Sequence, residues 1–108
     1  MLDLNDAGLL RTQNFIDGQW TNADDNSTFE VSNPANGDIV AAVANGGAAE
    51  TTRAVLAADA AMAAWKIRTA KERSHILRRW FDLIMQHQED LARIMTAEQG
   101  KPLAEALE

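Results

Sequence analysis

The hydrophobic pattern of the chain changes once, near residue 46, and this change limits the folds available to it. Residues 1–46 combine turn signals with short alternating stretches, whereas residues 47–108 repeat apolar residues at helical spacing. Strands followed by a run of helices are typical of α+β proteins. We therefore predict one α+β domain, with a β-hairpin and short strands in residues 1–46 and three to four helices in residues 47–108.

The first region carries one hairpin signal and two further strand signals. Asp17 and Gly18 separate two short apolar stretches, which is a strong signal for a two-residue hairpin turn. Phe29 and Val31 alternate with polar side chains, as in a half-buried strand. Asn-Pro and Asn-Gly turn pairs follow, and residues 38–44 are expected to form another short strand.

The second region predicts consecutive helices. Residues 48–62 suit an alanine-rich helix, and Trp65 is expected in the short connection after it. Thr69 and Glu72 fit a capping box that opens a second helix. The apolar stripe of that helix is wide, which predicts that the helix is covered on more than one side. Its members are Ile76, Leu77, Trp80, Phe81, Leu83, Ile84 and Gln88.

The helical pattern shifts near residues 87–89, where a third helix is expected to begin. Glu89 and Asp90 then lie in its first turn, where the helix dipole favours anions. Gly100 suits the left-handed conformation that ends a helix, and Pro102 suits the first turn of the next one.

A search for catalytic residues finds no constellation. His75 and His87 are twelve residues apart, so they predict no local metal site, and ordinary helix-surface or packing roles are favoured. Glu89 and Asp90 are adjacent, so on a helix their side chains point about 100° apart. A position in the first turn of a helix explains them better than a catalytic pair of carboxylates. The serines lack the G-x-S-x-G context of a nucleophile; they are Ser27, Ser32 and Ser74.

Two glycine-containing stretches are candidates for phosphate binding, and both are better explained as turns. Asn45-Gly46-Gly47 precedes a helix but lacks the G-x-G-x-x-G pattern, so a strand-to-helix turn is favoured. Gly100-Lys101 is followed by Pro102 rather than Ser or Thr, which excludes a P-loop ending. Core anchoring is favoured over an aromatic cage for Trp20, Trp65 and Trp80. We predict no catalytic, cofactor-binding or metal-binding residue in these 108 positions.

The charge balance argues against two classes of partner. The formal net charge is -6, which does not suit nucleic acid or an anionic membrane as a partner. The segment from Thr69 to Arg79 is locally basic, because Lys71, Arg73, Arg78 and Arg79 are balanced only by Glu72. This local positive charge predicts a solvated helix face or a contact with an acidic protein surface. There is no cysteine, no apolar run of membrane-spanning length and no signal-peptide pattern, so a cytoplasmic location is expected.

Four segments, in order, resemble the aldehyde dehydrogenase superfamily. FIDGQW is similar to the family's opening hairpin, SNPANGDIVAAV to its Asn-Pro-Ala-x-Gly turn and following strand, and EQGKP to its Glu-x-Gly-Lys-Pro segment. The helical stretch from Thr69 to Ala106 resembles the N-terminal helices of the family, most closely those of bacterial succinate-semialdehyde dehydrogenases. Together the segments cover almost the whole chain.

The resemblance implies that the chain is an N-terminal fragment of an NAD(P)-dependent enzyme, truncated within a Rossmann-like cofactor domain. Such enzymes oxidise an aldehyde to an acid through a cysteine thiolate and a glutamate base, and succinate semialdehyde is the implied substrate. Both groups would lie downstream of these residues, so the isolated chain is expected to be inactive. Leu107-Glu108 departs from the family and is either a cloning junction or a native helical turn.

Other interpretations stay open. The chain is alternatively a free-standing helical interaction module, or a fragment of an aldehyde dehydrogenase with another substrate. The choice between NAD and NADP is not determined by these residues. Helix faces that would pack against the rest of the parent enzyme are expected to cause self-association of the fragment.

Overall fold

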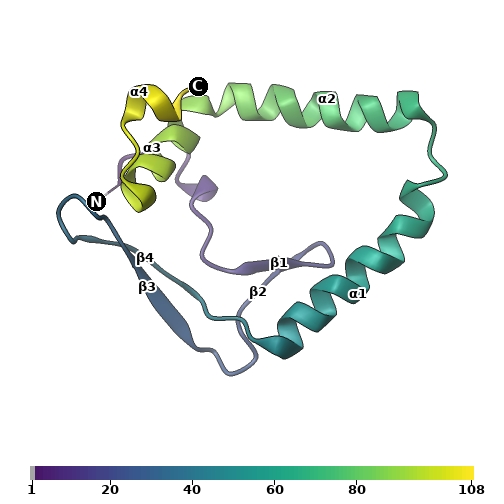
Figure 1. Ribbon diagram of the computed structural model, residues 1–108, viewed down its shortest axis with the longest axis horizontal. Helices are drawn as coiled ribbons and strands as arrows, with labels where there is room; N and C mark the ends of the chain where they lie inside the picture. The colour runs from purple at the N-terminus through teal and green to yellow at the C-terminus, as the bar shows by residue number, and fades with distance from the viewer. Residues whose placement is uncertain (1) are drawn as a thin grey trace.

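The computed structural model describes residues 2–108, in which two small antiparallel sheets precede four α-helices (Figure 1). This arrangement confirms the predicted α+β class and the order of strands before helices. A short 3-10 turn, η1 (Ala7–Leu9), comes before the first strand and was not predicted. The strands are β1 (Asn14–Ile16), β2 (Gln19–Thr21), β3 (Thr28–Ser32) and β4 (Ile39–Ala44).

The predicted hairpin joins β1 to β2. Asp17 and Gly18 have φ angles of 51° and 75°, the positive values that a tight two-residue hairpin turn needs. Phe15 pairs with Trp20 across the strands, and the centroids of their rings lie 5.0 Å apart. The guanidinium of Arg11 covers the Trp20 ring at 4.7 Å. An aromatic pair and a cation therefore hold this small sheet together on its exposed side.

The strands β3 and β4 form the second sheet, with an irregularity in their register between Val31 and Ser32. Val31 is half-buried as expected. Phe29 is not, because 53% of its surface stays exposed. The alternation therefore predicted the strand correctly, but only part of its apolar side is covered within residues 2–108.

The helices begin and end close to the predicted positions, with two corrections. Trp65 is the last residue of α1 rather than part of a connection, since the helical bonds run on to Lys66, whose N–H donates to the Met62 carbonyl. Gln88 begins α3 instead of ending α2, because the chain leaves helical geometry at His87. The helices are α1 (Ala48–Trp65), α2 (Ala70–Gln86), α3 (Gln88–Gln99) and α4 (Leu103–Ala106).

The predicted caps of α2 and α3 are confirmed. The Thr69 hydroxyl accepts from the Glu72 N–H at 3.1 Å, and the Glu72 carboxylate accepts from the Thr69 N–H at 2.9 Å. Gly100 ends α3 in the left-handed conformation at φ 83°. Pro102 lies one residue before α4 rather than inside its first turn, and its carbonyl accepts from the N–H groups of Glu105 and Ala106.

Replacing Gly100 with alanine tests this helix end. The positive φ alone costs a side chain about 1–2 kcal/mol, and an added Cβ would lie 2.9 Å from Cγ of Pro34. We expect Gly100→Ala to lower the free energy of unfolding in urea by roughly 2–4 kcal/mol. Gly37→Ala is the control, because Gly37 has a similar φ of 79° with open space around it. Equal losses for both variants would show that the contact with Pro34 contributes nothing.

The interior of the described chain is small. Only alanines are fully buried among its hydrophobic residues, namely Ala23, Ala92 and Ala97. The radius of gyration is 16.6 Å, against about 13 Å for a compact domain of 100 residues. Figure 1 shows why: α1 and α2 form two sides of an open outline, and the sheets and α3 complete it. The helices and sheets of residues 2–108 thus leave most of their apolar sides facing outward.

This openness corrects two predictions. The helix α2 is not covered on more than one side within residues 2–108, because none of its residues is buried and only Arg73 and Leu83 are half-buried. Core anchoring is wrong for two of the three tryptophans, because Trp20 and Trp80 are 40% and 63% exposed. The apolar side of α2, called here the apolar arc, consists of Ile76, Leu77, Trp80, Phe81, Ile84 and Met85.

Candidate functional site

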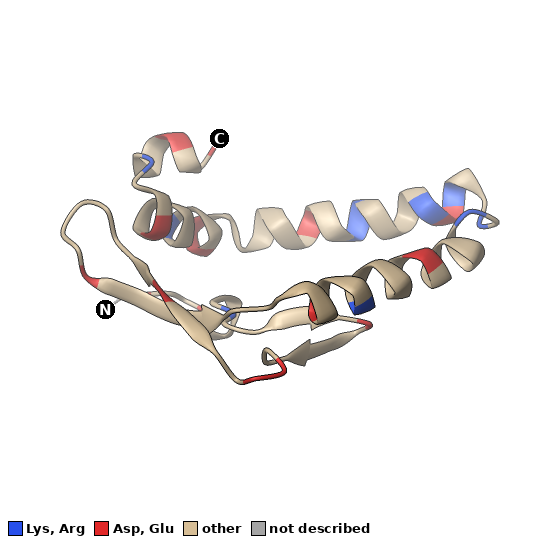
Figure 2. Cartoon of the chain, turned by 60° about the horizontal axis from the view of Figure 1, so that its bottom comes forward, with Lys and Arg blue, Asp and Glu red and all other residues tan. Residues whose placement is uncertain are grey.

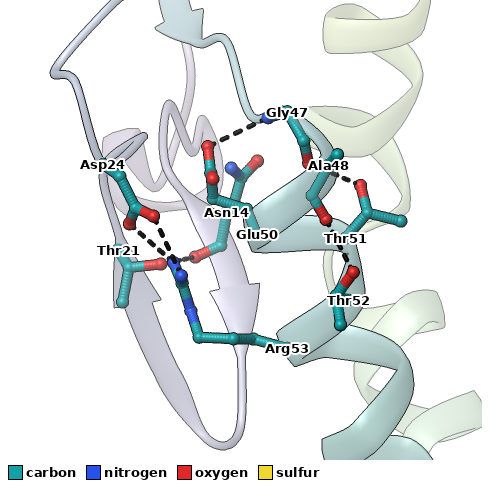
Figure 3. A network of polar contacts seen from close by, with 9 residues as sticks. All are labelled: Asn14, Thr21, Asp24, Gly47, Ala48, Glu50, Thr51, Thr52 and Arg53. Carbon is teal, nitrogen blue, oxygen red and sulfur yellow. Dashed lines mark hydrogen bonds and ion pairs between the residues drawn. The ribbon is translucent and has the colours of Figure 1, made fainter.

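The turn between β4 and α1 is a candidate for ligand binding because it precedes a helix. One of its backbone N–H groups already has a hydrogen-bond partner within the chain. The Gly47 N–H, at the start of the helix, donates to the Glu50 carboxylate at 2.9 Å (Figure 3). Glu50 is 7% exposed, and this bond holds its negative charge at the start of α1. Like charges at one helix start repel each other. The segment Asn45-Gly46-Gly47 connects β4 to α1, so the predicted strand-to-helix turn is found at this position.

A neighbouring ion pair fixes α1 against the loop after β2. Both terminal nitrogens of Arg53 donate to the Asp24 carboxylate, at 2.7 and 2.9 Å (Figure 3). This two-fold hydrogen bond to Arg53 lowers the pKa of Asp24, and the carboxylate in turn raises the pKa of Arg53. About half of each side chain is exposed, so the pair orients the helix more than it stabilises the fold.

The carboxylate pair at the start of α3 has a role that the sequence did not reveal. Glu89 is exposed, whereas Asp90 is only 2% exposed and accepts the N–H groups of Asn5 and Asp6, each at 2.8 Å. We call these two bonds the N-terminal clasp. The bond from Asn5, with help from that of Asp6 and the charge of Arg93, lowers the pKa of Asp90. The first-turn position was predicted correctly, but the partners are 84 and 85 residues away, beyond any local pattern.

The remaining candidates are not brought together. His75 is exposed on α2 and His87 lies at the junction with α3. No group of three or more His, Cys, Asp or Glu side chains suited to a metal ion occurs within residues 2–108. The Ser27 hydroxyl donates to the Asn45 carbonyl at 3.4 Å. None of the helices in the described chain is both long and apolar enough to span a bilayer.

The most distinctive surface lies where α1 meets α2. A hollow of about 570 Å³ is found there. Arg73 contributes an Nε atom that is enclosed yet has no hydrogen-bond partner within residues 2–108. Arg78, by contrast, is engaged by Asp82 at 3.4 Å and lies over the Phe81 ring at 4.9 Å. The hollow is lined by Trp65, Ala70, Arg73, Ser74, Leu77 and Arg78.

Figure 2 shows that the cations gather along the first half of α2 and in the connection before it, while the anions near the two sheets lie mostly in turns and loops. The hollow therefore combines guanidinium groups with apolar side chains, a combination suited to binding an acidic protein surface. Sequence reasoning had noted the basic cluster, but not that Arg73 differs from its neighbours. Its place in the same helical row as Leu77 is the signal that distinguishes it.

Comparison with known proteins gives a consistent result. The family model described as "Aldehyde dehydrogenase family" matches residues 20–108. The chain is 57% identical to a glutarate-semialdehyde dehydrogenase of Pseudomonas aeruginosa, over 97% of its own length. It is 58% identical to a 3-sulfolactaldehyde dehydrogenase of Pseudomonas putida, over 98%. It is 54% identical to an NADP(+) succinate-semialdehyde dehydrogenase of Escherichia coli, over 97%. In each case the chain spans 22% of the relative's length.

Solved structures agree with this assignment. A succinate-semialdehyde dehydrogenase from Burkholderia pseudomallei matches with a TM-score of 0.93 and 56% identity, covering 96% of this chain and 22% of that one. A betaine aldehyde dehydrogenase from Staphylococcus aureus, in complex with NAD+, matches with a TM-score of 0.86 and 34% identity, covering 91% and 20%. The chain therefore belongs to the aldehyde dehydrogenase family.

Proposed function

We propose that the chain is the N-terminal part of an NAD(P)-dependent aldehyde dehydrogenase that oxidises succinate semialdehyde to succinate. The observation that carries this proposal is the 54–58% identity, over nearly the whole chain, with dehydrogenases named for short aldehydes. These relatives span a much longer polypeptide than this chain, so the proposal concerns a whole protein of which residues 1–108 form one part.

The names of the relatives also support a broader substrate class. Succinate semialdehyde, glutarate semialdehyde and 3-sulfolactaldehyde each carry an acidic group at the end away from the aldehyde carbon. The three relatives differ in this acid while resembling the chain almost equally. We therefore infer a short aldehyde with a remote anionic group, with succinate semialdehyde as the first choice. The cofactor is NAD or NADP, since each is named for one of the relatives.

The chain's own part in the reaction is structural. It holds no cysteine, so the thiolate that attacks the aldehyde in this proposal must come from polypeptide outside residues 1–108. The side chains described above cap helices, join strands or face outward, and none is assigned to aldehyde or nicotinamide. The predicted cytoplasmic location stays a prediction.

An activity assay tests the proposal at two lengths. The 108-residue chain, mixed with succinate semialdehyde and NAD+ or NADP+, is expected to reduce no cofactor above the protein-free rate. The same sequence continued by its own reading frame is expected to reduce cofactor, with kcat/KM for succinate semialdehyde at least roughly a hundredfold above that for butanal. Butanal is the matched neutral substrate, because it lacks only the remote acid.

Three outcomes would contradict the proposal in different ways. Equal kcat/KM values for butanal and succinate semialdehyde would remove the acidic-substrate class. A higher value for glutarate semialdehyde or 3-sulfolactaldehyde would keep the class and replace the substrate. A reading frame that stops near residue 108 would favour the alternative, a helical interaction module, for which the exposed apolar arc of α2 is the supporting observation.

A further inference from the structure

We propose that Asn45 is a site of spontaneous deamidation in the folded chain, and that the fold protects Asn36, which has the same neighbours in sequence, from this reaction. The modification converts the Asn45 side chain to aspartate or isoaspartate and adds a negative charge just before α1. The inference does not depend on the proposed function, because the reacting groups lie within residues 2–108.

The chain contains the same reactive sequence twice. Ala-Asn-Gly occurs at residues 35–37 and again at residues 44–46. The first copy lies in the turn that joins β3 to β4, and the second lies at the end of β4, so the two asparagines are at opposite ends of that strand (Figure 1). Both asparagines are exposed. Since their immediate neighbours are identical, a difference in their reactivity would come from the structure around them.

The reaction needs only the asparagine, the residue after it and water. The deprotonated backbone nitrogen of that next residue attacks Cγ of the side chain. A bond forms from this nitrogen to Cγ, the bond from Cγ to Nδ2 breaks, and ammonia leaves after taking a proton from water. Water then opens the cyclic imide at either carbonyl carbon, which gives aspartate or isoaspartate. A glycine in the next position favours the attack, because it has no Cβ and its backbone turns freely.

The hydrogen bonds of the β3–β4 turn hold both reacting groups of the first copy. The Asn36 side-chain oxygen accepts from the Asp38 N–H at 2.9 Å. The Gly37 N–H, whose nitrogen would be the attacking atom, donates to the Asn33 carbonyl at 2.7 Å. Ring closure requires the nitrogen and Cγ to approach each other in the correct orientation. Both hydrogen bonds must therefore break before Asn36 can react.

The second copy is held only at its first half. The Asn45 N–H donates to the Ser27 carbonyl at 3.0 Å, and the Asn45 carbonyl accepts from the Ser27 hydroxyl at 3.4 Å. Neither the Asn45 side chain nor the Gly46 N–H makes a hydrogen bond within residues 2–108. The attacking nitrogen and its target can therefore approach each other without the loss of any hydrogen bond.

The product changes the connection between the sheet and the helices. In isoaspartate the chain runs through the side chain, so the backbone between residue 45 and Gly46 gains one atom. The former Asn45 carbonyl becomes a carboxylate. The Gly47 N–H, two residues further on, donates to the buried Glu50 carboxylate at the start of α1. A lengthened backbone and a new anion are thus introduced directly before this contact.

Mass spectrometry of the 108-residue chain, incubated at mildly alkaline pH, tests the proposal. Peptide fragmentation separates position 36 from position 45, and an isoaspartyl methyltransferase labels the isoaspartate formed. We expect Asn45 to lose its amide at least about tenfold faster than Asn36, because two hydrogen bonds protect the latter. In concentrated urea, which removes those bonds, the two rates should agree within about twofold.

Asn45→Gln is the matched variant, because its longer side chain disfavours the ring without changing charge. It should abolish the reaction at position 45 and leave the rate at Asn36 unchanged. A change at Gly46 is less suitable, since an added Cβ would lie 2.8 Å from Nδ2 of Asn14.

Three results would overturn the proposal. Equal rates at Asn36 and Asn45 in the folded chain would show that the fold protects neither. An Asn45 that reacts in urea but not in the folded chain would show that the folded structure blocks ring closure there. A tenfold difference that persists in urea would assign the selectivity to sequence rather than to the hydrogen bonds of the turn.

Discussion

Changing Leu77 and Ile84 together to glutamate is expected to make the isolated chain monomeric at concentrations where the unaltered chain associates. Both side chains lie on the apolar arc, about half exposed. Burying the exposed half of such a side chain contributes about 1 kcal/mol. Four of them meet in a symmetric dimer, so their loss weakens association by about 4 kcal/mol, close to a thousandfold in the dissociation constant.

Light scattering across a dilution series measures this effect. The control is the double variant His75→Glu and Gln86→Glu, which adds the same negative charge on the opposite side of α2. Each control position is two residues from a tested one, and two residues turn a helix by about 200°. The control should associate as the unaltered chain does. A mass for the unaltered chain that stays monomeric at every concentration would refute the prediction.

The second large effect is expected at Asp90. Asp90→Asn removes the negative charge that accepts both bonds of the N-terminal clasp. The amide has only one acceptor oxygen, so its NH₂ group would face the N–H of either Asn5 or Asp6, and two donors cannot bond to each other. We expect the amides of Asn5 and Asp6, each 2.8 Å from the carboxylate, to exchange at least about tenfold faster. Glu89→Gln is the control, since it makes the same charge change on an exposed side chain. Unchanged exchange in Asp90→Asn would mean that the clasp does not hold the N-terminal segment.

The clasp also predicts a pH dependence with a defined sign. Its hydrogen bonds lower the pKa of Asp90 in the folded chain, so folding favours the ionised carboxylate. The stabilisation is complete above the unfolded pKa, about 3.9, and is lost as the pH falls through the lowered folded pKa. Protection of Asn5 and Asp6, corrected for intrinsic exchange, should therefore be constant near neutrality and fall in acid. In Asp90→Asn, the protection of Asn5 and Asp6 should not fall in acid in this way, because the carboxyl group that titrates is absent.

Local signals in the sequence predicted local structure well. The Asp17-Gly18 turn, the Thr69–Glu72 capping box and the Gly100 helix end each depend on residues within a few positions of one another. Each was found where its chemistry requires it. The break at His87 was located only approximately, because an apolar stripe continues through it and assigned Gln88 to the wrong helix.

Contacts between distant residues were not predictable in the same way. A buried Asp90 has the same local pattern as an exposed helix-start carboxylate, and only its partners near the N-terminus distinguish them. Periodicity likewise identified the apolar arc but not what covers it. The expectation that Trp80 anchors a core failed for this reason, since an amphipathic pattern records that a face is apolar and not where its partner lies.

The N-terminal clasp also has a consequence for the order of events during synthesis. Asp6 and Asp90 are 84 residues apart, and ribosomes add about 5–20 residues per second. The first residues therefore wait about 4 to 17 seconds before their acceptor has been made. The β1–β2 hairpin and the capped start of α2 need only neighbouring residues, so they can form during that interval. The clasp is therefore among the last contacts of this segment to form, because its acceptor does not exist until the start of α3 has been translated.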